Sequence, residues 1–308
     1  MSNVYDTLII GGGPAGYTAA LYATRAGLNT AILERMSPGG QMALTDVIDN
    51  YPGFPEGVDG IMLGMNMQMQ AEKFGAKTIY EDVVAVDFTD PAQKAVKTAS
   101  NTYHARTVII ATGANPRMLG LPNEKELTGK GVHYCAHCDG RFYKGKTVAV
   151  VGGGNSAVSD ALYLSRVTDK VYVIHRRDSL RATKIYHEPL MKAENVEFVW
   201  DSAITEILSD GRVTGVLVKN LKDGSEQEVH FSGLFVSIGR QPATDFLDGI
   251  LELDNYGYIV ADESTRTSIP GVFAVGDVRT KALRQVVTAV ADGATAIHYV
   301  EEYLSEIL

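Results

Sequence analysis

Residues 5–16 read YDTLIIGGGPAG, and this stretch predicts the fold of the whole chain. Residues 5–10 form a short apolar run typical of a buried strand, and the glycines after it fit the pattern G-x-G-x-x-G. Residues 17–26 are mostly good helix formers that end at Gly27, and a second apolar run then leads to Glu34. Strand, glycine loop, helix, strand and a terminal acid together make a complete dinucleotide-binding unit.

Each part of this loop has a physical task in holding a dinucleotide. Gly11 allows the tight turn, Gly13 lets a pyrophosphate approach backbone N–H groups, and Gly16 lets helix and strand pack closely. Glu34 would accept hydrogen bonds from ribose hydroxyls. A glycine-rich turn in an unrelated α/β fold is the alternative. The first nucleotide site therefore comprises Gly11, Gly13, Pro14, Ala15, Gly16 and Glu34.

The chain repeats this pattern from residue 146 onward. Residues 146–151 are again an apolar run, and residues 152–157, GGGNSA, again open a helix. At the position that corresponds to Glu34 the second copy has His175, which begins the run HRRDSLR. Fixed positive charge thus stands where the first copy has a carboxylate. The second nucleotide site comprises Gly152, Gly154, Asn155, Ser156, Ala157, His175, Arg176, Arg177 and Arg181.

The different ends of the two copies predict different nucleotides. Guanidinium groups bind a 2′-phosphate by bidentate, charge-assisted hydrogen bonds, whereas a carboxylate would repel it. We therefore expect NADPH rather than NADH at the second site. The alternative is that these arginines form a solvated surface patch.

Both cysteines of the 308-residue chain lie in one run, Cys135-Ala136-His137-Cys138. This spacing is typical of a dithiol that opens and closes during turnover. A structural disulfide is one alternative, and a metal site that uses His133 and His137 is another. Structural zinc usually takes a second ligand pair from a distant segment, and the sequence offers none, so we predict no metal. A disulfide accepts electrons slowly from NADPH unless a flavin mediates, so we expect the first nucleotide to be FAD.

Composition narrows the class of protein further. The net charge of −9 argues against nucleic acid as a partner, because phosphate binding favours a basic surface. No apolar run approaches the roughly 18 residues that span a bilayer, so we expect no membrane association. Two cysteines and no secretory signal indicate a cytoplasmic protein.

Taken in order, these motifs resemble those of bacterial-type, low-molecular-weight thioredoxin reductases over essentially the whole chain. The resemblance implies an α/β fold of two Rossmann-like domains, in which the NADPH domain is inserted into the FAD domain. It agrees with chain breakers at residues 113–116 and 241–242. We expect residues 1–115 and 243–308 to bind FAD, and residues 116–242 to bind NADPH and carry the dithiol. The resemblance also implies a homodimer.

The resemblance assigns further site residues. In the dithiol, Cys138 would lie nearer the flavin and accept its electrons, Cys135 would attack the disulfide of thioredoxin or a related redoxin, and Asp139 would donate protons. Simple turn or cap roles are the alternatives for Asp139 and for Asp277. His137 departs from the family, which commonly has Thr or Val there. The resemblance adds to the FAD site Gly40, Gln41, Asn50, Ala111, Thr112, Gly113, Gly276, Asp277, Arg284 and Gln285.

The sequence therefore predicts a thioredoxin-disulfide reductase that uses NADPH and FAD. Two alternatives are similar flavoproteins: a ferredoxin-dependent reductase, which takes electrons from another donor, and a dithiol oxidase, which takes them from a small dithiol. Neither enzyme needs an NADPH pocket, so Arg176, Arg177 and Arg181 argue against both. A non-catalytic interaction module is the third alternative, and the intact Cys135-x-x-Cys138-Asp139 motif argues against it.

Replacing Arg176 and Arg177 by glutamine should weaken NADPH binding far more than NADH binding. The loss of both charge-assisted contacts would weaken the binding free energy of NADPH by roughly 2 kcal/mol or more. NADH has no 2′-phosphate for these arginines to bind, so its affinity should change little. Titration of wild type and variant with each nucleotide measures the two effects. Equal losses for both nucleotides would contradict this assignment.

Overall fold

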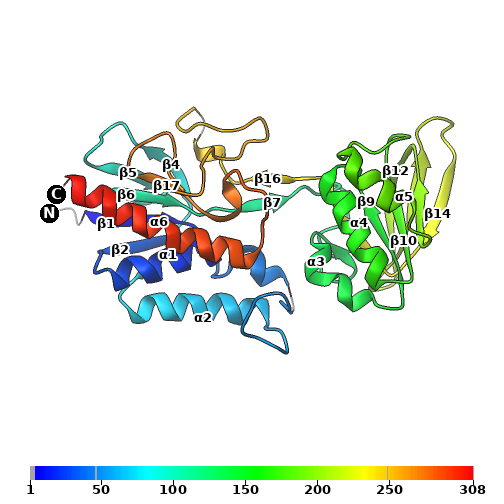
Figure 1. Ribbon diagram of the computed structural model, residues 1–308, viewed down its shortest axis with the longest axis horizontal. Coiled ribbons are helices and arrows are strands. Elements are labelled where there is room, and N and C mark those ends of the chain that lie inside the picture. The colour runs from blue at the N-terminus through cyan, green and yellow to red at the C-terminus, as the bar shows by residue number, and fades with distance from the viewer. Residues whose placement is uncertain (1–3, 46, 248, 308) are drawn as a thin grey trace. The chain divides into compact units, whose positions relative to one another are not determined.

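The computed structural model describes residues 4–45, 47–247 and 249–307 and contains two compact units (Figure 1). Unit 1 consists of Met1–Asn115 and Gln241–Leu308, and unit 2 is the intervening segment Pro116–Arg240. None of the helices in the described ranges is long and apolar enough to cross a membrane.

Unit 1 is built on a mixed sheet that is seven-stranded within the described residues. Its strands have the order β3-β2-β1-β6-β5-β4, with β17 paired to β6. Strands β3, β2, β1, β6 and β17 are parallel, whereas β4 and β5 form an antiparallel extension. The strands are β1 (Tyr5–Ile10), β2 (Thr30–Glu34), β3 (Lys77–Tyr80), β4 (Val83–Asp87), β5 (Lys94–Thr98), β6 (Thr102–Ile110) and β17 (Val272–Ala274).

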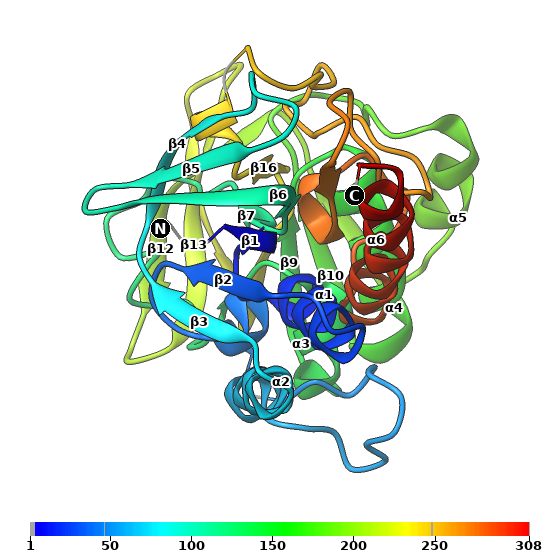
Figure 2. The same cartoon turned by 90° about the vertical axis from the view of Figure 1, so that its left-hand side faces the viewer.

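Two apolar layers cover the faces of this sheet. Ile9 and its neighbours pack against α1 and α6, which lie side by side (Figure 2). Leu8 and Ile10 face a second cluster, which includes residues of β4, of β5 and of the segment before β17. Alternation along β1 thus buries both faces, as expected for a parallel sheet. The helices are α1 (Pro14–Arg25), α2 (Gly60–Lys73) and α6 (Val286–Ile307), with 3-10 turns η1 (Gly40–Leu44), η4 (Asp245–Leu247) and η5 (Gly276–Val278).

Unit 2 repeats the architecture of unit 1 on a smaller scale. A parallel sheet of order β11-β10-β9-β15-β8 packs with α4, and a three-stranded antiparallel sheet, β12-β13-β14, follows β11. The strands are β8 (Val132–His133), β9 (Thr147–Val151), β10 (Lys170–Ile174), β11 (Val196–Val199), β12 (Ser202–Ser209), β13 (Val213–Asn220), β14 (Glu226–His230) and β15 (Gly233–Val236). The helical elements are α3 (Ala136–Asp139), η2 (Gly140–Tyr143), α4 (Asn155–Val167), η3 (Lys184–Tyr186) and α5 (His187–Met191).

The chain passes between the units through a two-stranded ribbon. Strands β7 (Ala114–Pro116) and β16 (Arg240–Pro242) pair with each other. The Arg117 N–H donates to the Gly239 carbonyl at 3.0 Å, which extends the ribbon by one bond. The two connections are therefore held to each other where they leave unit 1.

Two helices differ in detail from the sequence pattern. In α2, the helical spacing of Met62, Met65 and Met69 predicts a core or subunit-contact face. These side chains are 51%, 42% and 56% exposed, so they are not core residues of unit 1. The sequence predicts a helix that opens at Arg284, whereas α6 begins at Val286. The Gln285 N–H donates to Thr288 Oγ1 at 3.1 Å, which places Gln285 in a capping position before the first helical turn.

The glycine loop after β1 is held by contacts that leave no space for a side chain. A Cβ atom on Gly16 would lie 1.9 Å from the Gly11 carbonyl oxygen. Gly11 has a φ of +107°, and a Cβ there would lie 2.5 Å from the Ala111 oxygen. Because these neighbours are backbone atoms, side-chain movement cannot relieve the clash.

Gly16→Ala should destabilise the protein by about 2 kcal/mol or more, since the new methyl group would push α1 away from β1. Gly13→Ala is the matched control, because a Cβ there would meet nothing within 4 Å, and it should cost less than about 1 kcal/mol. Urea unfolding in buffer without nucleotide measures both. Similar losses for the two variants would contradict the close-packing argument.

Candidate active site

The first glycine loop is tied to the acid that ends β2. The Gly12 N–H donates to Glu34 Oε2 at 2.7 Å, and the Met36 N–H donates to Oε1 at 3.0 Å. Around Gly13, by contrast, space is open at the position a Cβ would take. The structure therefore leaves room for a ligand at the start of α1, where backbone N–H groups favour an anion.

Residues distant in sequence gather around this loop at the carboxyl ends of the parallel strands. The Gly39 N–H donates to the Gly12 carbonyl at 2.8 Å, and a Cβ on Gly40 would lie 3.5 Å from Gly13 Cα. On another side, a Cβ on Gly276 would lie 3.0 Å from Ala15 Cβ. The predicted residues Pro14, Ala15 and Gly16 form the first turn of α1.

The segment after β6 is fixed against the returning chain. The Ala111 N–H donates to the Ile10 carbonyl at 2.8 Å, which aligns residue 111 with the end of β1. Thr112 Oγ1 donates to the Ala243 carbonyl at 2.8 Å, and the Ala243 N–H donates to the Gly113 carbonyl at 3.0 Å. All three predicted residues of this segment thus belong to the same edge of the sheet.

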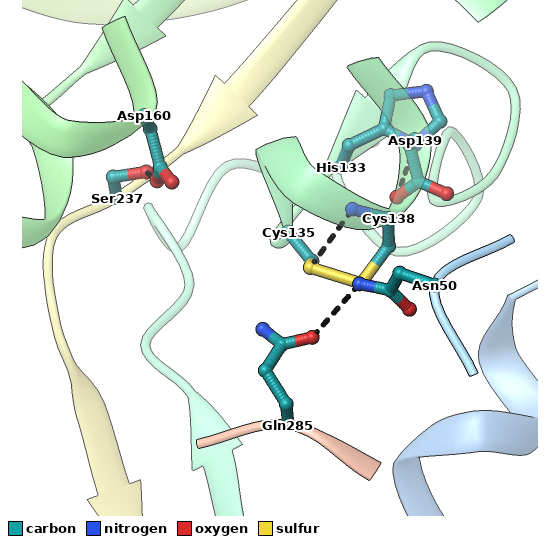
Figure 3. Close-up of a disulfide and its surroundings, with 8 residues drawn as sticks. All are labelled: Asn50, His133, Cys135, Cys138, Asp139, Asp160, Ser237 and Gln285. Atoms are coloured by element: carbon teal, nitrogen blue, oxygen red, sulfur yellow. Dashed lines mark hydrogen bonds and ion pairs between the residues drawn. A yellow bond between two sulfur atoms is a disulfide. The ribbon is translucent and has the colours of Figure 1, made fainter. Parts of the chain in front are cut away.

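Polar side chains predicted for the first site hydrogen bond to residues distant in sequence within unit 1. Gln41 Nε2 donates to Asn115 Oδ1 at 3.2 Å, and Asn50 Nδ2 donates to Gln285 Oε1 at 3.0 Å (Figure 3). The Arg284 guanidinium lies 3.9 Å from the centre of the Tyr258 ring. Arg284 also donates to the carbonyls of residues 277 and 279, so it supports the loop that carries Asp277.

A buried charge cluster holds the Gly276 turn. Asp292 of α6 accepts from the Gly276 N–H at 2.8 Å, from Arg279 Nη2 at 2.8 Å and from Lys281 Nζ at 2.8 Å. Burial by itself raises the pKa of Asp292, but the hydrogen bonds from Arg279 and Lys281 outweigh it and hold the pKa below its usual value. The carboxylate is therefore ionised and fixes the backbone on which Asp277 stands.

The second glycine loop has the same geometry between β9 and α4. The Gly152 N–H donates to the Ile174 carbonyl at 3.1 Å, as the Gly11 N–H donates to the Leu33 carbonyl at 2.8 Å in unit 1. At the start of α4, space is open around Gly154. Asn155 Oδ1 accepts from the Thr183 N–H at 2.8 Å, so the loop after β10 closes onto the helix start. Ser156 and the buried Ala157 lie in the first turn of α4.

His175 takes the place of the acid in the second copy. Its ring is buried, and a Cβ on Gly153 would lie 2.3 Å from it. Burial lowers the pKa of His175, and the charges of Arg181, Arg177 and Arg176 lower it further. The ring is therefore neutral, and the three arginines, which are exposed, supply the positive charge around it.

The two cysteines form a disulfide within unit 2 (Figure 3). Cys135 caps the short helix α3, Cys138 lies within it, and their Cα atoms are 5.3 Å apart. The Cys138 N–H points at Cys135 Sγ at 3.2 Å. Within the described ranges, no group of His, Cys, Asp and Glu side chains is arranged to hold a metal ion.

Asp139 lies beside a buried histidine. His133 Nδ1 is 3.1 Å from Asp139 Oδ2, and His133 Nε2 is 2.7 Å from the Tyr143 hydroxyl. The His133 ring stacks on Phe235 with 5.3 Å between ring centres. Asp139 therefore has a defined side-chain partner in addition to its place in a turn.

Two further contacts involve helix α4, which packs beside the dithiol helix α3. The His137 ring packs on Tyr163 of α4, with 4.3 Å between ring centres. Ser237 Oγ donates a short hydrogen bond to Asp160, also of α4. Burial raises the pKa of Asp160, against the opposing effects of Ser237, His137 and Arg240. His137, the departure from the family pattern, thus lies between the dithiol helix and α4.

Sequence reasoning missed His133 as the partner of Asp139 and Asp292 as the anchor of Gly276. The sequence did contain a sign of the role of Asp292, because this aspartate lies on the apolar face of α6. A carboxylate on a buried helix face usually has a buried cationic partner. For His133 the sequence suggested only a metal ligand, and its real contact depends on the pairing of β8 with β15.

The chain is similar to known proteins over nearly its whole length. The family described as pyridine nucleotide-disulphide oxidoreductase matches residues 5–293. The thioredoxin reductase of Peptoclostridium litorale is 46% identical, with 100% of this chain and 99% of that protein covered. That of Bacillus subtilis is 45% identical over 99% of this chain and 96% of its own length. The crystal structure of thioredoxin reductase from Streptococcus pyogenes is 46% identical and superposes with a TM-score of 0.91, covering 99% of this chain and all of that one.

Asp292→Asn should destabilise the protein by about 3 kcal/mol at neutral pH, because it removes the buried counter-charge that Arg279 and Lys281 share and leaves Arg279 only the exposed Glu263 at 3.7 Å. The matched control is Glu302→Gln on the same helix, whose ion pair with Arg266 is half exposed and should cost less than about 1 kcal/mol.

The effect of Asp292→Asn should depend on pH in a defined direction. Since the pKa of Asp292 is lowered in the folded state, its contribution is complete above the unfolded pKa and is lost as the pH falls through the folded pKa. Urea unfolding of both variants across the acid range measures this. A loss for Asp292→Asn that equals the Glu302→Gln control would contradict the assigned role.

Proposed function

Because the chain belongs to the pyridine nucleotide-disulphide oxidoreductase family, we propose that it reduces the disulfide of thioredoxin or a related redoxin with electrons from NADPH. The overall reaction is NADPH + H⁺ + redoxin disulfide → NADP⁺ + redoxin dithiol. Two electrons and one proton leave NADPH as a hydride, and solvent supplies the second proton. The relatives named above, which are covered over 96% or more of their length, are thioredoxin reductases, and this supports the substrate class.

One observation carries the proposal. The Cys135–Cys138 disulfide and its neighbour Asp139 lie in the same unit as the second glycine loop and the exposed arginines that follow β10. A dithiol and an NADPH-type loop in one unit fit an enzyme that moves electrons from a nucleotide to a disulfide. A dithiol oxidase or a ferredoxin-dependent enzyme would need no such arginines.

The residues present fit the two cofactors. At the first loop, open space at Gly13 and the carboxylate of Glu34 suit a dinucleotide with an unphosphorylated ribose, which we assign as FAD. At the second loop, open space at Gly154 and the arginines suit NADPH. Unit 1 would thus bind FAD and unit 2 NADPH. When bound, the flavin accepts the hydride from NADPH and supplies two electrons to the disulfide.

Within the dithiol we assign unlike roles to the two sulfurs. Cys138 would receive electrons, and Cys135 would attack the protein disulfide. The Cys138 N–H directed at Cys135 Sγ supports this order, because a backbone donor stabilises a thiolate. Asp139 would take up and return the proton that each thiol releases.

We further propose a homodimer in the cytoplasm. Ile61, Met62, Met65 and Met69 expose an apolar face on α2, and such a face on a single chain is typical of an interface. A reducing compartment would suit a dithiol that must be regenerated as thiols in each cycle.

Anaerobic NADPH should bleach the flavin of the purified protein, and thioredoxin with a disulfide dye should then be turned over. Cys135→Ser and Cys138→Ser should each lower this turnover at least about 100-fold, because neither single thiol can complete the exchange. Both variants should still oxidise NADPH with ferricyanide. Ferricyanide takes electrons from the flavin directly, so this reaction shows that NADPH and FAD binding are intact.

Three outcomes would contradict the proposal. Turnover with NADH equal to that with NADPH would refute the nucleotide assignment. Oxygen consumption with a small dithiol and no NADPH would favour an oxidase. Full redoxin turnover by either serine variant would exclude the dithiol from the reaction.

A further inference from the structure

Two contacts lead from Tyr143 to the carboxylate of Asp139. The charged Arg212 guanidinium lies near enough to Tyr143 to lower the pKa of its hydroxyl, against the effect of burial. That hydroxyl lies 2.7 Å from His133 Nε2, and His133 Nδ1 lies 3.1 Å from Asp139 Oδ2 (Figure 3 shows the last contact). Arg212 is exposed, whereas His133 and Tyr143 are buried.

The direction of each bond follows from the donors available. A guanidinium cannot accept a hydrogen bond, so Arg212 offers the Tyr143 O–H no acceptor. Burial raises the pKa of Tyr143 to about 12, although Arg212 acts in the opposite direction, so the phenol keeps its proton at neutral pH. We therefore assign the tyrosine O–H as the donor to His133 Nε2, which lies 2.7 Å away. A neutral imidazole that accepts at Nε2 carries its proton on Nδ1, and that N–H points at Asp139.

Packing fixes the ring in this orientation. His133 lies at the end of β8, which pairs with β15 and brings Phe235 under the ring at 5.3 Å between centres. Tyr143 meets the same ring edge-on at 5.3 Å. The imidazole therefore cannot turn without breaking both aromatic contacts, so its Nδ1–H is a preorganised donor.

We propose that His133 is the positioning residue of Asp139, with its tautomer fixed by Tyr143 so that the Nδ1–H holds the carboxylate beside the dithiol. The inference rests on the proposed function, since it deepens the role of Asp139 in dithiol exchange. It reverses the usual arrangement in which a carboxylate orients a histidine.

In the dithiol–disulfide exchange with the substrate, atoms and electrons balance and the protonation state of His133 does not change. Cys135 Sγ bonds to one substrate sulfur as the substrate S–S bond breaks, and Cys138 Sγ then bonds to Cys135 Sγ as the mixed disulfide breaks. Two electrons pass to the substrate, and the two thiol protons of the enzyme end on the two substrate thiols. Asp139 carries these protons one at a time while His133 keeps its Nδ1–H directed at Oδ2.

His133→Ala should lower kcat for thioredoxin reduction by the holoenzyme about tenfold and leave KM within about twofold, since the substrate does not touch His133. His133→Asn should restore most of kcat, because the asparagine Nδ2–H occupies the place of the histidine Nδ1–H. Reduction of ferricyanide by NADPH should be unchanged in both. Loss of kcat in His133→Asn equal to that in His133→Ala would overturn the proposal.

A double-variant comparison separates positioning from mere stability. Asp139→Asn alone should lower kcat about 100-fold, and adding His133→Ala should lower it no further, because the histidine acts only through the carboxylate. Additive losses would overturn the proposal. Tyr134→Phe is the matched control. Tyr134 precedes Cys135 in the sequence, but its hydroxyl donates to Glu124 Oε1 at 2.9 Å and takes no part in the contacts that reach Asp139. This variant should leave kcat unchanged.

The tautomer of His133 provides a readout independent of turnover. Nitrogen NMR of the oxidised holoenzyme with ¹⁵N-labelled histidine should show the Nδ1–H form for the resonance that disappears in His133→Asn, and an Nε2–H form would overturn the proposal. If wild type reduces no protein disulfide but shows the Nδ1–H form, the proposed function fails while the positioning contact stands. If wild type is active and His133→Ala loses nothing, the positioning role fails while the function stands.

Discussion

The structure depends on the contact of backbone with backbone in its two glycine loops. A Cβ on Gly11 would lie 2.5 Å from the Ala111 carbonyl oxygen, and a Cβ on Gly152 would lie 2.3 Å from that of Ser237. Because no side chain intervenes, each glycine turn lies directly against the backbone that follows a neighbouring strand, and the backbone N–H groups at the helix start stay open to a ligand. Both nucleotide sites follow from this single constraint.

The residue that ends the second strand of each copy makes the two sites chemically different. In unit 1 the Glu34 carboxylate accepts from the Gly12 N–H at 2.7 Å, whereas in unit 2 the His175 ring fills the space over Gly153. The same backbone position thus carries a charge in one copy and a neutral ring in the other. The neutral ring leaves the three arginines that follow it as the dominant charge, which is why the second loop suits a phosphorylated ribose.

Local sequence patterns were sufficient for the α/β fold, because strand, glycine turn and helix follow one another within about 20 residues. Contacts between distant segments were not readable in the same way. His133 meets Asp139 only because β8 pairs with β15, and Asp292 anchors Gly276 only because α6 packs beside the turn. The methionines of α2 show the same limit, since helical spacing indicates an apolar face but not whether it is buried in the unit or left exposed.

Electrons from NADPH should reach the Cys135–Cys138 disulfide. The decisive experiment adds one equivalent of NADPH to the oxidised protein without oxygen, alkylates the thiols and locates the labels by mass spectrometry. Both cysteines should carry labels after NADPH and neither without it. A bleached flavin with both cysteines still unlabelled would refute this electron path, because the electrons would then stop before the disulfide.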